Sequence, residues 1–285
     1  MAKLLTGKDV VAAMAVDLAP RIEALRVAGI TPTLALVRVG ANPDDISYEH
    51  TAIKRAEKLG VALRRFELSS DATQAQVEAV IDQVNGDEAV HGCLMFRPLP
   101  RTIDERAVCD RLLPEKDIDG ISMSSLAAVF ADSDQGFPPC TAAACVRMLD
   151  FYRIPVEGKH VVVVGRSLVI GRPVGLMLLR RNASVTLCHS RSENLPDLTR
   201  LADIVICATG RPRAFGGKYF RAGQTVLDVG INFDDEGVFC GDVDFAAVEP
   251  IVGAITPVPG GLGSVTTSVT MEQTVRAAEG ALALQ

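Results

Sequence analysis

The stretch HVVVVGRSLVIGRPVG, residues 160–175, decides the fold class of this chain. Residues 160–164 form an apolar run without alternation, which is typical of a central parallel strand buried on both faces. A turn that contains Gly165, Ser167 and Gly171 follows directly. A strand that enters a helix through such a turn presents backbone N–H groups at its carboxyl end, where a pyrophosphate binds. The stretch therefore predicts a nucleotide-binding parallel α/β unit; because the spacing is not G-x-G-x-x-G, a tight turn without a ligand stays open.

The end of the next strand indicates which nucleotide is bound. In a dinucleotide fold, a carboxylate at this point binds the ribose 2′-hydroxyl of NAD and repels the 2′-phosphate of NADP. Here the strand SVTLC, residues 184–188, is followed by HSRS, with no carboxylate. Arg191, the hydroxyl of Ser190 and Arg166 in the glycine turn are suited to a phosphate. NADP is therefore predicted over NAD, with a solvated surface charge as the alternative for Arg191.

The first half of the chain alternates helix and strand signals, which is the pattern of a parallel sheet with crossover helices. We expect helices over about 7–28, from ANPDD to about 59 and from 73 to about 86, and strands over 33–40, 62–68 and 92–96. Gly60 supplies a helix stop, and Thr73 with Gln76 has the spacing of a capping box. The polar segment DSDQGFPP, residues 132–139, is the predicted domain boundary. A helix over 141–151 and strands over 184–188, 203–209 and 225–230 are expected beyond it.

The composition excludes several classes of protein. A length of 285 residues with 48% hydrophobic and 22% charged residues fits two globular domains and excludes a disordered chain, a collagen-like repeat or a coiled coil. Lys and Arg total 29 against 35 Asp and Glu, a net charge of −6, so no basic field draws the chain to nucleic acid or anionic lipid. No apolar stretch approaches the roughly 20 residues of a membrane-spanning helix. Asp9 and Asp17 interrupt what would be the apolar part of a signal peptide.

The cysteines indicate a reducing compartment. All seven are scattered and none has the C-x-x-C spacing, which argues against a disulfide framework or a zinc site. We therefore expect reduced, mostly buried thiols in a cytoplasmic protein without a metal.

Several strings along the chain resemble one known family. They are VGANP and SYEHTAIKRAEKLG, RPLP and PEKDIDG, then VVVVGRSLVIGRPVG, ASVTLCHSRS, LADIVICATG, VLDVGIN, GDVDF and TPVPGGLGS. Together they resemble the methylenetetrahydrofolate dehydrogenase/methenyltetrahydrofolate cyclohydrolases over nearly the whole chain. The resemblance implies a two-lobed α/β fold: a Rossmann-like NADP-binding domain at 140–265, and a folate-binding catalytic domain of residues 1–139 with a C-terminal helix at 266–285. It also implies a homodimer.

The resemblance assigns roles to individual residues. The family oxidises the methylene bridge of 5,10-methylenetetrahydrofolate by hydride transfer to NADP, and then hydrolyses the methenyl cation to 10-formyltetrahydrofolate. By resemblance, Tyr48 stacks on the aminobenzoyl ring of the folate and Asp119 binds the pterin, which suits an aromatic ring and a carboxylate. Without the resemblance, the alternative interpretation is that Tyr48 is a helix tyrosine packed in a core and that Asp119 is a turn residue before Gly120. The other implied residues are Pro259, Gly260 and Gly261, for close backbone approach, and Ile231, for the cofactor.

The hydrolytic site departs from the family. The family places a lysine one helical turn after the tyrosine, where it activates the attacking water, and pairs it with a glutamine before the PLP string. Here these positions are Ala52 and Phe96. An alanine beside a phenylalanine makes the pocket apolar without leaving a buried polar group unpaired. Neither Lys54 nor His50 falls on the helix face of Tyr48, so the sequence predicts loss of the water-activating pair.

Asp45 is a further departure, because the family usually has serine there. Spacings of three and four put positions 45, 48 and 52 on one helix face. In a pocket lined by Phe96, a carboxylate would have a raised pKa and act as a catalytic proton acceptor. The alternative is an acidic residue favoured by the helix dipole. Arg97 also differs from the family, and strand alternation turns it away from Phe96.

These observations lead to one prediction of function. Hydride transfer needs little from side chains, because the cofactor and the folate supply the reactivity and the protein supplies orientation. We predict an NADP-dependent methylenetetrahydrofolate dehydrogenase with weak or absent cyclohydrolase activity. Three alternatives stay open: a bifunctional enzyme in which Asp45 or His50 replaces the lysine, a paralogue acting on a modified one-carbon carrier, and a protein that binds folate or nucleotide without turnover.

Overall fold

The chain folds into two compact units, and the computed structural model describes residues 1–283. The six-stranded unit consists of residues 1–12 and 141–266. The three-stranded unit consists of residues 13–140 and the chain from 267 onward. Helices α1 (Gly7–Val27) and α10 (Leu262–Ala283) each contribute residues to both units.

The start of the chain belongs to the six-stranded unit, whereas the sequence placed residues 1–139 together in the other domain. The reason is β1 (Lys3–Leu4), which pairs in parallel with β11 (Ala254–Ile255) at the edge of the larger sheet. A strand of 2 residues carries no periodic signal, so this pairing with a distant segment leaves no local trace in the sequence.

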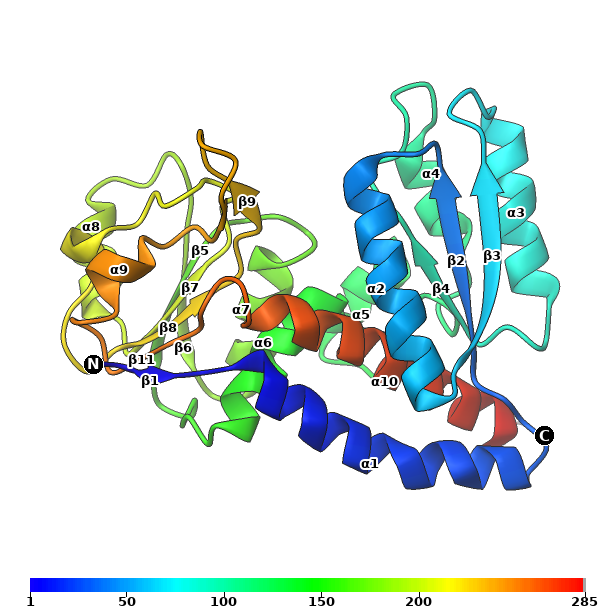
Figure 1. The fold of residues 1–285 in the computed structure, drawn as a ribbon, viewed down its shortest axis with the longest axis horizontal. Helices are drawn as coiled ribbons and strands as arrows, with labels where there is room; N and C mark the ends of the chain where they lie inside the picture. Colours follow the sequence, from blue (N-terminus) through cyan, green and yellow to red (C-terminus); the bar gives the residue numbers. More distant parts are fainter. Residues whose placement is uncertain (284–285) are drawn as a thin grey trace. The chain divides into compact units, whose positions relative to one another are not determined.

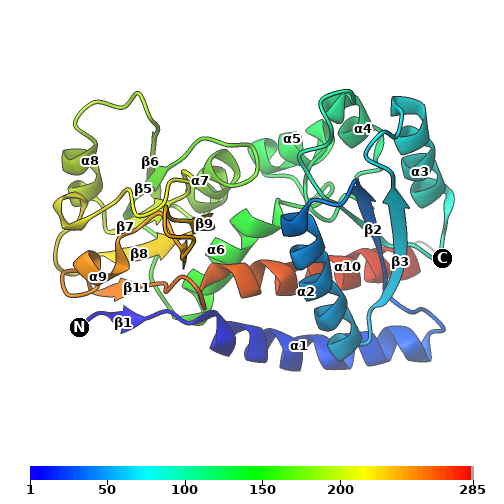
Figure 2. The same ribbon diagram turned by 45° about the horizontal axis from the view of Figure 1, so that its top comes forward.

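The larger sheet is parallel throughout, in the order β1-β11-β8-β7-β5-β6. Its remaining strands are β5 (His160–Val164), β6 (Ser184–Cys188), β7 (Ile204–Cys207) and β8 (Thr225–Asp228). Residues 161–164 are buried and β5 has a neighbour on each side, which confirms the predicted central strand. Figure 2 shows β8, β11 and β1 side by side toward one edge.

The order of these strands locates a binding point. Helix α7 (Gly171–Arg180) connects β5 to β6, and α8 (Leu195–Leu201) connects β6 to β7. Because β6 and β7 lie on opposite sides of β5, the strand order reverses at β5. Ligands of open parallel sheets bind outside the carboxyl ends of the strands at such a reversal. The turn at Gly165, directly after β5, lies at this point.

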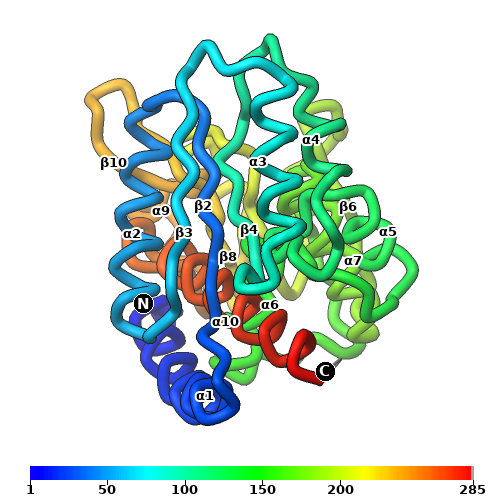
Figure 3. The backbone as a smooth tube through the Cα atoms, turned by 90° about the vertical axis from the view of Figure 1, so that its right-hand side faces the viewer, coloured from blue at the N-terminus to red at the C-terminus, as the bar shows by residue number. Residues whose placement is uncertain are grey.

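The smaller sheet has the order β3-β2-β4, and both pairings are parallel, as predicted. Its strands are β2 (Thr33–Val39), β3 (Ala62–Leu68) and β4 (Gly92–Met95). Figure 1 shows α2 (Pro43–Leu59) and α3 (Gln74–Gly86) flanking these strands. Figure 3 shows the two helices on opposite sides of β2 and β3.

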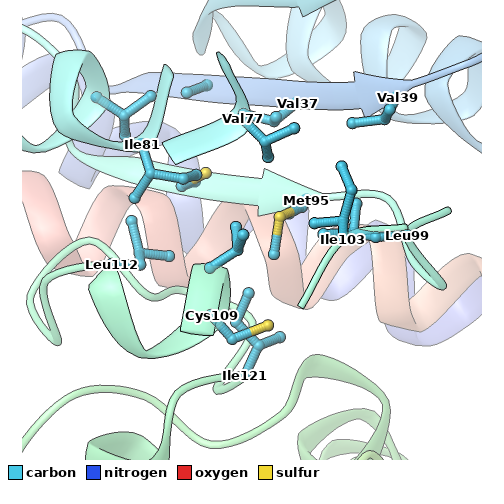
Figure 4. Packing of buried hydrophobic residues seen from close by; sticks show 14 of the residues in the cluster. Val37, Val39, Val77, Ile81, Met95, Leu99, Ile103, Cys109, Leu112 and Ile121 are labelled. Atoms are coloured by element: carbon cyan, nitrogen blue, oxygen red, sulfur yellow. The ribbon is translucent and has the colours of Figure 1, made fainter. Parts of the chain in front are cut away.

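Alternate residues of β2 enter two different cores. Ala35, Val37 and Val39 pack with α3 and with α4 (Glu105–Arg111), in the cluster drawn in Figure 4. Leu34 and Leu36 pack on the other face with residues of α1, α2 and α10. The C-terminal helix therefore completes a core of the three-stranded unit, which is the return of this helix that the resemblance implied.

Local signals set the helix ends. Asn42 caps α2 by accepting the N–H of Asp44, and Gly60 ends the helix in the left-handed conformation. Thr73 and Gln76 form both halves of the predicted capping box at α3. The other elements are α5 (Met123–Ala131), α6 (Cys140–Phe151), α9 (Phe245–Val248), a 3₁₀ turn (Gly217–Tyr219), and the antiparallel pair β9 (Asn232–Phe233) and β10 (Phe239–Cys240).

All seven cysteines are buried with free thiols, as the sequence predicted. Within residues 1–283, no helix combines the length and the hydropathy needed to cross a membrane. The same residues contain no group of three side chains arranged to hold a metal ion.

Candidate active site

The predicted phosphate-binding turn can be built only with glycine at two positions. Gly165 has φ of +142°, and a Cβ there would lie 2.3 Å from the carbonyl oxygen of Ala208. A Cβ at Gly171 would lie 2.2 Å from the carbonyl oxygen of Gly165. The turn thus folds tightly onto the first residue of α7. The hydroxyl of Ser167 accepts the N–H of Ile170 at 3.1 Å and closes it.

The other predicted cofactor residues lie at the ends of neighbouring strands. Arg166, Ser190 and Arg191 are exposed, and Ile231 after β8 is 65% exposed. Within the loop after β6, the N–H of His189 donates to Ser192 Oγ at 2.9 Å, which leaves Ser190 and Arg191 at the surface. A cradle of glycine backbone next to two exposed guanidinium groups fits a pyrophosphate and a ribose 2′-phosphate.

Two buried aspartates that sequence reasoning missed organise the loops around Ile231. Asp228 accepts the backbone N–H groups of Gly230, Asp242 and Val243, at 2.9–3.0 Å. Asp242 in turn accepts the N–H of Arg211 at 2.9 Å and the side-chain amide of Asn232 at 2.9 Å. The loops after β7 and β8 are therefore held to the segment after β10 by carboxylate hydrogen bonds.

Burial raises the pKa of Asp228 to about 6, although the three N–H groups favour its ionised form. A Cβ on Gly241 would lie 1.9 Å from Asp228 Oδ2, so this glycine is needed beside the carboxylate. The glycine before Asp242 in the string GDVDF was the available sequence signal, because a glycine there permits close approach.

The predicted substrate residue Tyr48 and the two replaced positions, Ala52 and Phe96, come together in the three-stranded unit. The rings of Tyr48 and Phe96 meet edge to face, with centroids 6.1 Å apart and planes at 81°. Ala52 is fully buried in the same apolar cluster, whose other members come from α1, β2, β4 and α10. Lys54 and His50 are exposed on other faces of α2.

The phenol of Tyr48 lies in a polar corner of this cluster. The pKa of Tyr48 is raised well above its usual range, mainly by burial and to a lesser extent by the negative charges of Asp119 and Cys140 in their ionised forms. Side-chain hydrogen bonds with Thr270 and Thr267 of α10 act in the opposite direction. The charge of Asp119 thus acts on the phenol of Tyr48.

A set of hydrogen bonds holds Asp119 in place. Its Oδ1 accepts the N–H of Cys140 at 3.3 Å, and Gln273 Nε2 donates to the carbonyl oxygens of Ile118 at 2.6 Å and Pro138 at 3.0 Å. Burial raises the pKa of Asp119, and the positive charge of Arg97 opposes this shift. Cys140 and Gln273 were missed by sequence reasoning, because their partners lie far away in the chain.

The remaining departures from the family lie at the edge of this site. Asp45 is half-buried in the first turn of α2. Its pKa is raised, mainly by burial and to a lesser extent by the negative charge of the neighbouring Asp44. Arg97 lies 3.6 Å from Glu105 Oε1 of α4, and its buried Nε has no hydrogen-bond partner among the described residues. Phe96 instead packs in the apolar cluster that contains Ala52 and Ala56 of α2. The side chains of Phe96 and Arg97 therefore point in different directions, as strand alternation predicted.

Residues 259–261, which the resemblance assigns to close approach at the substrate, lie against the start of α1 within the six-stranded unit. The N–H of Gly7 donates to the carbonyl oxygen of Gly260 at 2.8 Å. A Cβ on Gly7 would lie 2.1 Å from the carbonyl oxygen of Gly261, and one on Gly261 would lie 2.5 Å from that of Pro257. The backbone of Gly260 and Gly261 therefore packs against the start of α1.

Comparison with known proteins gives one result over both units. Residues 139–282 match the model of the tetrahydrofolate dehydrogenase/cyclohydrolase NAD(P)-binding domain, and residues 5–119 match that of the catalytic domain. The bifunctional protein FolD of Carboxydothermus hydrogenoformans is 49% identical over 281 residues, 98% of each chain.

Two solved structures show the same fold. The bifunctional FolD dehydrogenase/cyclohydrolase of Campylobacter jejuni is 35% identical with a TM-score of 0.95, over 98% of this chain and 99% of that one. The Trypanosoma brucei dehydrogenase-cyclohydrolase, solved with NADP and an inhibitor, is 31% identical with a TM-score of 0.93, over 99% of this chain and 98% of that one.

Proposed function

The chain belongs to the tetrahydrofolate dehydrogenase/cyclohydrolase family, and on that premise we propose that it is an NADP-dependent methylenetetrahydrofolate dehydrogenase with weak or absent cyclohydrolase activity. The six-stranded unit binds NADP, and the three-stranded unit binds the folate. The chemistry that NADP supplies when bound is acceptance of a hydride. The protein contributes binding and orientation.

Each predicted residue has a role in this proposal. The turn at Gly165 brings the backbone N–H groups of Ser167 and Gly171 to the pyrophosphate, while the N–H of Gly165 itself donates to the carbonyl oxygen of Cys188. Arg166, Ser190 and Arg191 hold the 2′-phosphate. Ile231, exposed in the loop after β8, contacts the cofactor. Tyr48 stacks on the aminobenzoyl ring, and Asp119 accepts hydrogen bonds from the pterin. The backbone of Pro259, Gly260 and Gly261 is placed at the substrate by resemblance alone, since its observed approach is to Gly7.

One observation carries the proposed loss of hydrolysis: Ala52 and Phe96 pack with Tyr48 in a single apolar cluster. Attack by water on the methenyl carbon needs a group that accepts or directs the proton of that water, within hydrogen-bond reach. The family's lysine and glutamine would occupy these two positions. An alanine and a phenylalanine have no polar atom for this task.

The test is a product assay with 5,10-methylenetetrahydrofolate and NADP. The proposal predicts enzyme-dependent NADPH formation while 10-formyltetrahydrofolate appears only at the spontaneous rate. Formation of the 10-formyl product much faster than the spontaneous hydrolysis of the methenyl compound present would contradict the loss of hydrolysis. Absence of NADPH formation would contradict the dehydrogenase assignment.

A second candidate is the bifunctional enzyme with Asp45 as substitute base. The raised pKa of Asp45, one turn before Tyr48, favours it. This candidate predicts protein-dependent hydrolysis that Asp45→Asn abolishes while NADPH formation persists. Hydrolysis that is absent from the unmodified protein, or unchanged in the variant, excludes Asp45 as the base.

A homodimer in the cytoplasm completes the proposal. Light scattering across a concentration series gives the mass in solution, which we expect to be twice 30.3 kDa. A mass of 30.3 kDa at every concentration would contradict the dimer.

A further inference from the structure

Helix α2 carries Tyr48, and three of its large apolar side chains, Tyr48, Ile53 and Leu59, are only partly buried against the core of the three-stranded unit. Its fully buried residues are Glu49, Ala52 and Ala56. The two alanine methyl groups are small and interlock weakly with the side chains opposite, so they add little to the resistance of the helix against rotation. The third buried residue, Glu49, carries a carboxylate, and a buried carboxylate must keep its hydrogen-bond donors.

Glu49 belongs to a closed ring of four charges that joins α2 to β2 and β3. Arg38 Nε donates to Glu49 Oε2 at 2.8 Å, and Arg65 Nε donates to Glu49 Oε1 at 2.9 Å. Glu67 closes the ring by accepting from Arg38 Nη2 at 2.8 Å and pairing with Arg65 Nη2 at 2.6 Å. Both oxygens of each carboxylate are therefore used. The side chains of Glu49 and Arg38 are 2% and 10% exposed, whereas Arg65 and Glu67 reach solvent.

The same guanidinium also holds the loop that leads into α2. Arg38 Nη1 donates to the carbonyl oxygen of Gly40, where the chain leaves β2 in a left-handed conformation. One arginine thus fixes the strand end, the loop and the second turn of the helix. Burial alone would raise the pKa of Glu49, but the hydrogen bonds from Arg38 and Arg65 outweigh it and lower the pKa.

Rotation of α2 would cost much more free energy at this ring of four charges than at the two alanines. Turning the helix would separate a buried carboxylate from two donors, and a buried charge without its partner is strongly unfavourable. Tyr48 is the neighbour of Glu49 in the chain, so the rotation that satisfies Glu49 also sets the direction of the Tyr48 ring, edge to face with Phe96.

We propose that the buried Arg38–Glu49 pair is a positioning element that fixes the rotation of α2 and thereby holds the Tyr48 ring where the aminobenzoyl group of the folate stacks. This inference rests on the proposed function. Because stacking on Tyr48 binds substrate and transition state alike, loss of the position raises KM for the folate and leaves kcat nearly unchanged.

The test compares Glu49→Gln, Arg38→Met and the double variant Arg38→Met/Glu49→Met in the NADPH assay, with thermal unfolding measured in parallel. We expect KM for the folate to rise about tenfold in each single variant, with kcat and KM for NADP within about twofold of the unmodified protein. The double variant removes both buried charges and leaves Arg65 paired with Glu67. It should recover thermal stability while its KM for the folate stays raised, because an apolar pair packs without specifying a rotation.

Asp82→Asn is the matched control. It removes a carboxylate held by both Nε and Nη2 of Arg111, between α3 and α4, and should leave every kinetic parameter unchanged. If Glu49→Gln fails to fold, Glu67→Gln replaces it, because Glu67 is half-exposed and bonds the same two arginines. A rise of about two- to threefold in KM for the folate is expected there.

An unchanged KM for the folate in every folded variant would overturn the inference, as would a double variant that regains the original KM together with its stability. A failure of the proposed function itself is distinct, because the unmodified protein would then form no NADPH.

Discussion

The glycine turn after β5 is built from backbone groups, whereas the Tyr48 cluster on α2 is built from side chains. The turn consists of backbone groups of residues 165–171 packed against Ala208, and its geometry depends on glycines that admit no Cβ. The Tyr48 cluster consists of side chains from α1, α2, β2, β4 and α10 and from the loops between them, brought together by the fold. A site made of backbone keeps its chemistry when side chains change. A site made of side chains can lose one reaction through two substitutions, here at positions 52 and 96.

The largest expected effect is at the turn. Gly171→Ala places a Cβ 2.2 Å from the carbonyl oxygen of Gly165, so the turn and the start of α7 must separate. We expect NADP binding to weaken about a thousandfold, measured by fluorescence titration. Gly216→Ala is the control, since no atom lies within 4 Å of its added Cβ and it should bind NADP normally. Normal binding by Gly171→Ala would show that backbone geometry does not define this site.

The buried carboxylates of the six-stranded unit give the next effect. With its pKa raised from 3.8 to about 6, Asp228 holds its proton in the folded protein to a higher pH than in the unfolded chain. Its contribution to stability is full below about pH 4 and is lost as the pH rises through about 6. Asp228→Asn cannot ionise, so relative to the variant the unmodified protein should lose about 3 kcal/mol of unfolding free energy between pH 4 and pH 7. Denaturant unfolding at each pH checks this, and a constant difference would refute the shifted pKa.

A gain of function tests the side-chain site. Ala52→Lys with Phe96→Gln should raise the hydrolysis of the methenyl compound at least about tenfold, because general acid–base groups contribute on this scale or above. Ala52→Lys alone buries an ammonium without a partner, so it should unfold at a lower temperature than the double variant. Hydrolysis unchanged in a folded double variant would show that these two positions do not explain the missing reaction.

The smallest expected effect concerns Arg97. Its charge lowers the pKa of Asp119 against the effect of burial, so Arg97→Leu should raise that pKa further. The carboxylate would then take up a proton at a higher pH. The acidic limb of kcat/KM for the folate should therefore move to higher pH, by about one unit or less, with little change at alkaline pH. A profile that coincides with that of the unmodified protein would separate Arg97 from Asp119.

The same contrast explains what the sequence could predict. The ends of α2 and α3 were predictable because Gly60, Thr73 and Gln76 act on their immediate neighbours. The central strand β5 was predictable from its uninterrupted apolar run. These features need only local physics.

The parts that were missed depend on distant partners. Glu49 sits in a helix with a polar pattern and looks solvated until Arg38 and Arg65 are brought against it. The roles of Gln273 and Cys140 can be recognised only in the folded chain, where α10 lies against the loop that carries Asp119. β1 pairs with a strand near the far end of the chain. Periodicity and spacing carry no information on such encounters.

The central claim is that the cluster of Tyr48, Ala52 and Phe96 has lost the means to activate water while the folate is still oxidised. The most direct measurement supplies the methenyl compound itself and follows its disappearance with and without the protein. The account predicts rates that change little or not at all with protein concentration, in a preparation that forms NADPH from the methylene compound. A rate of disappearance that rises with protein concentration as steeply as NADPH formation does would contradict it.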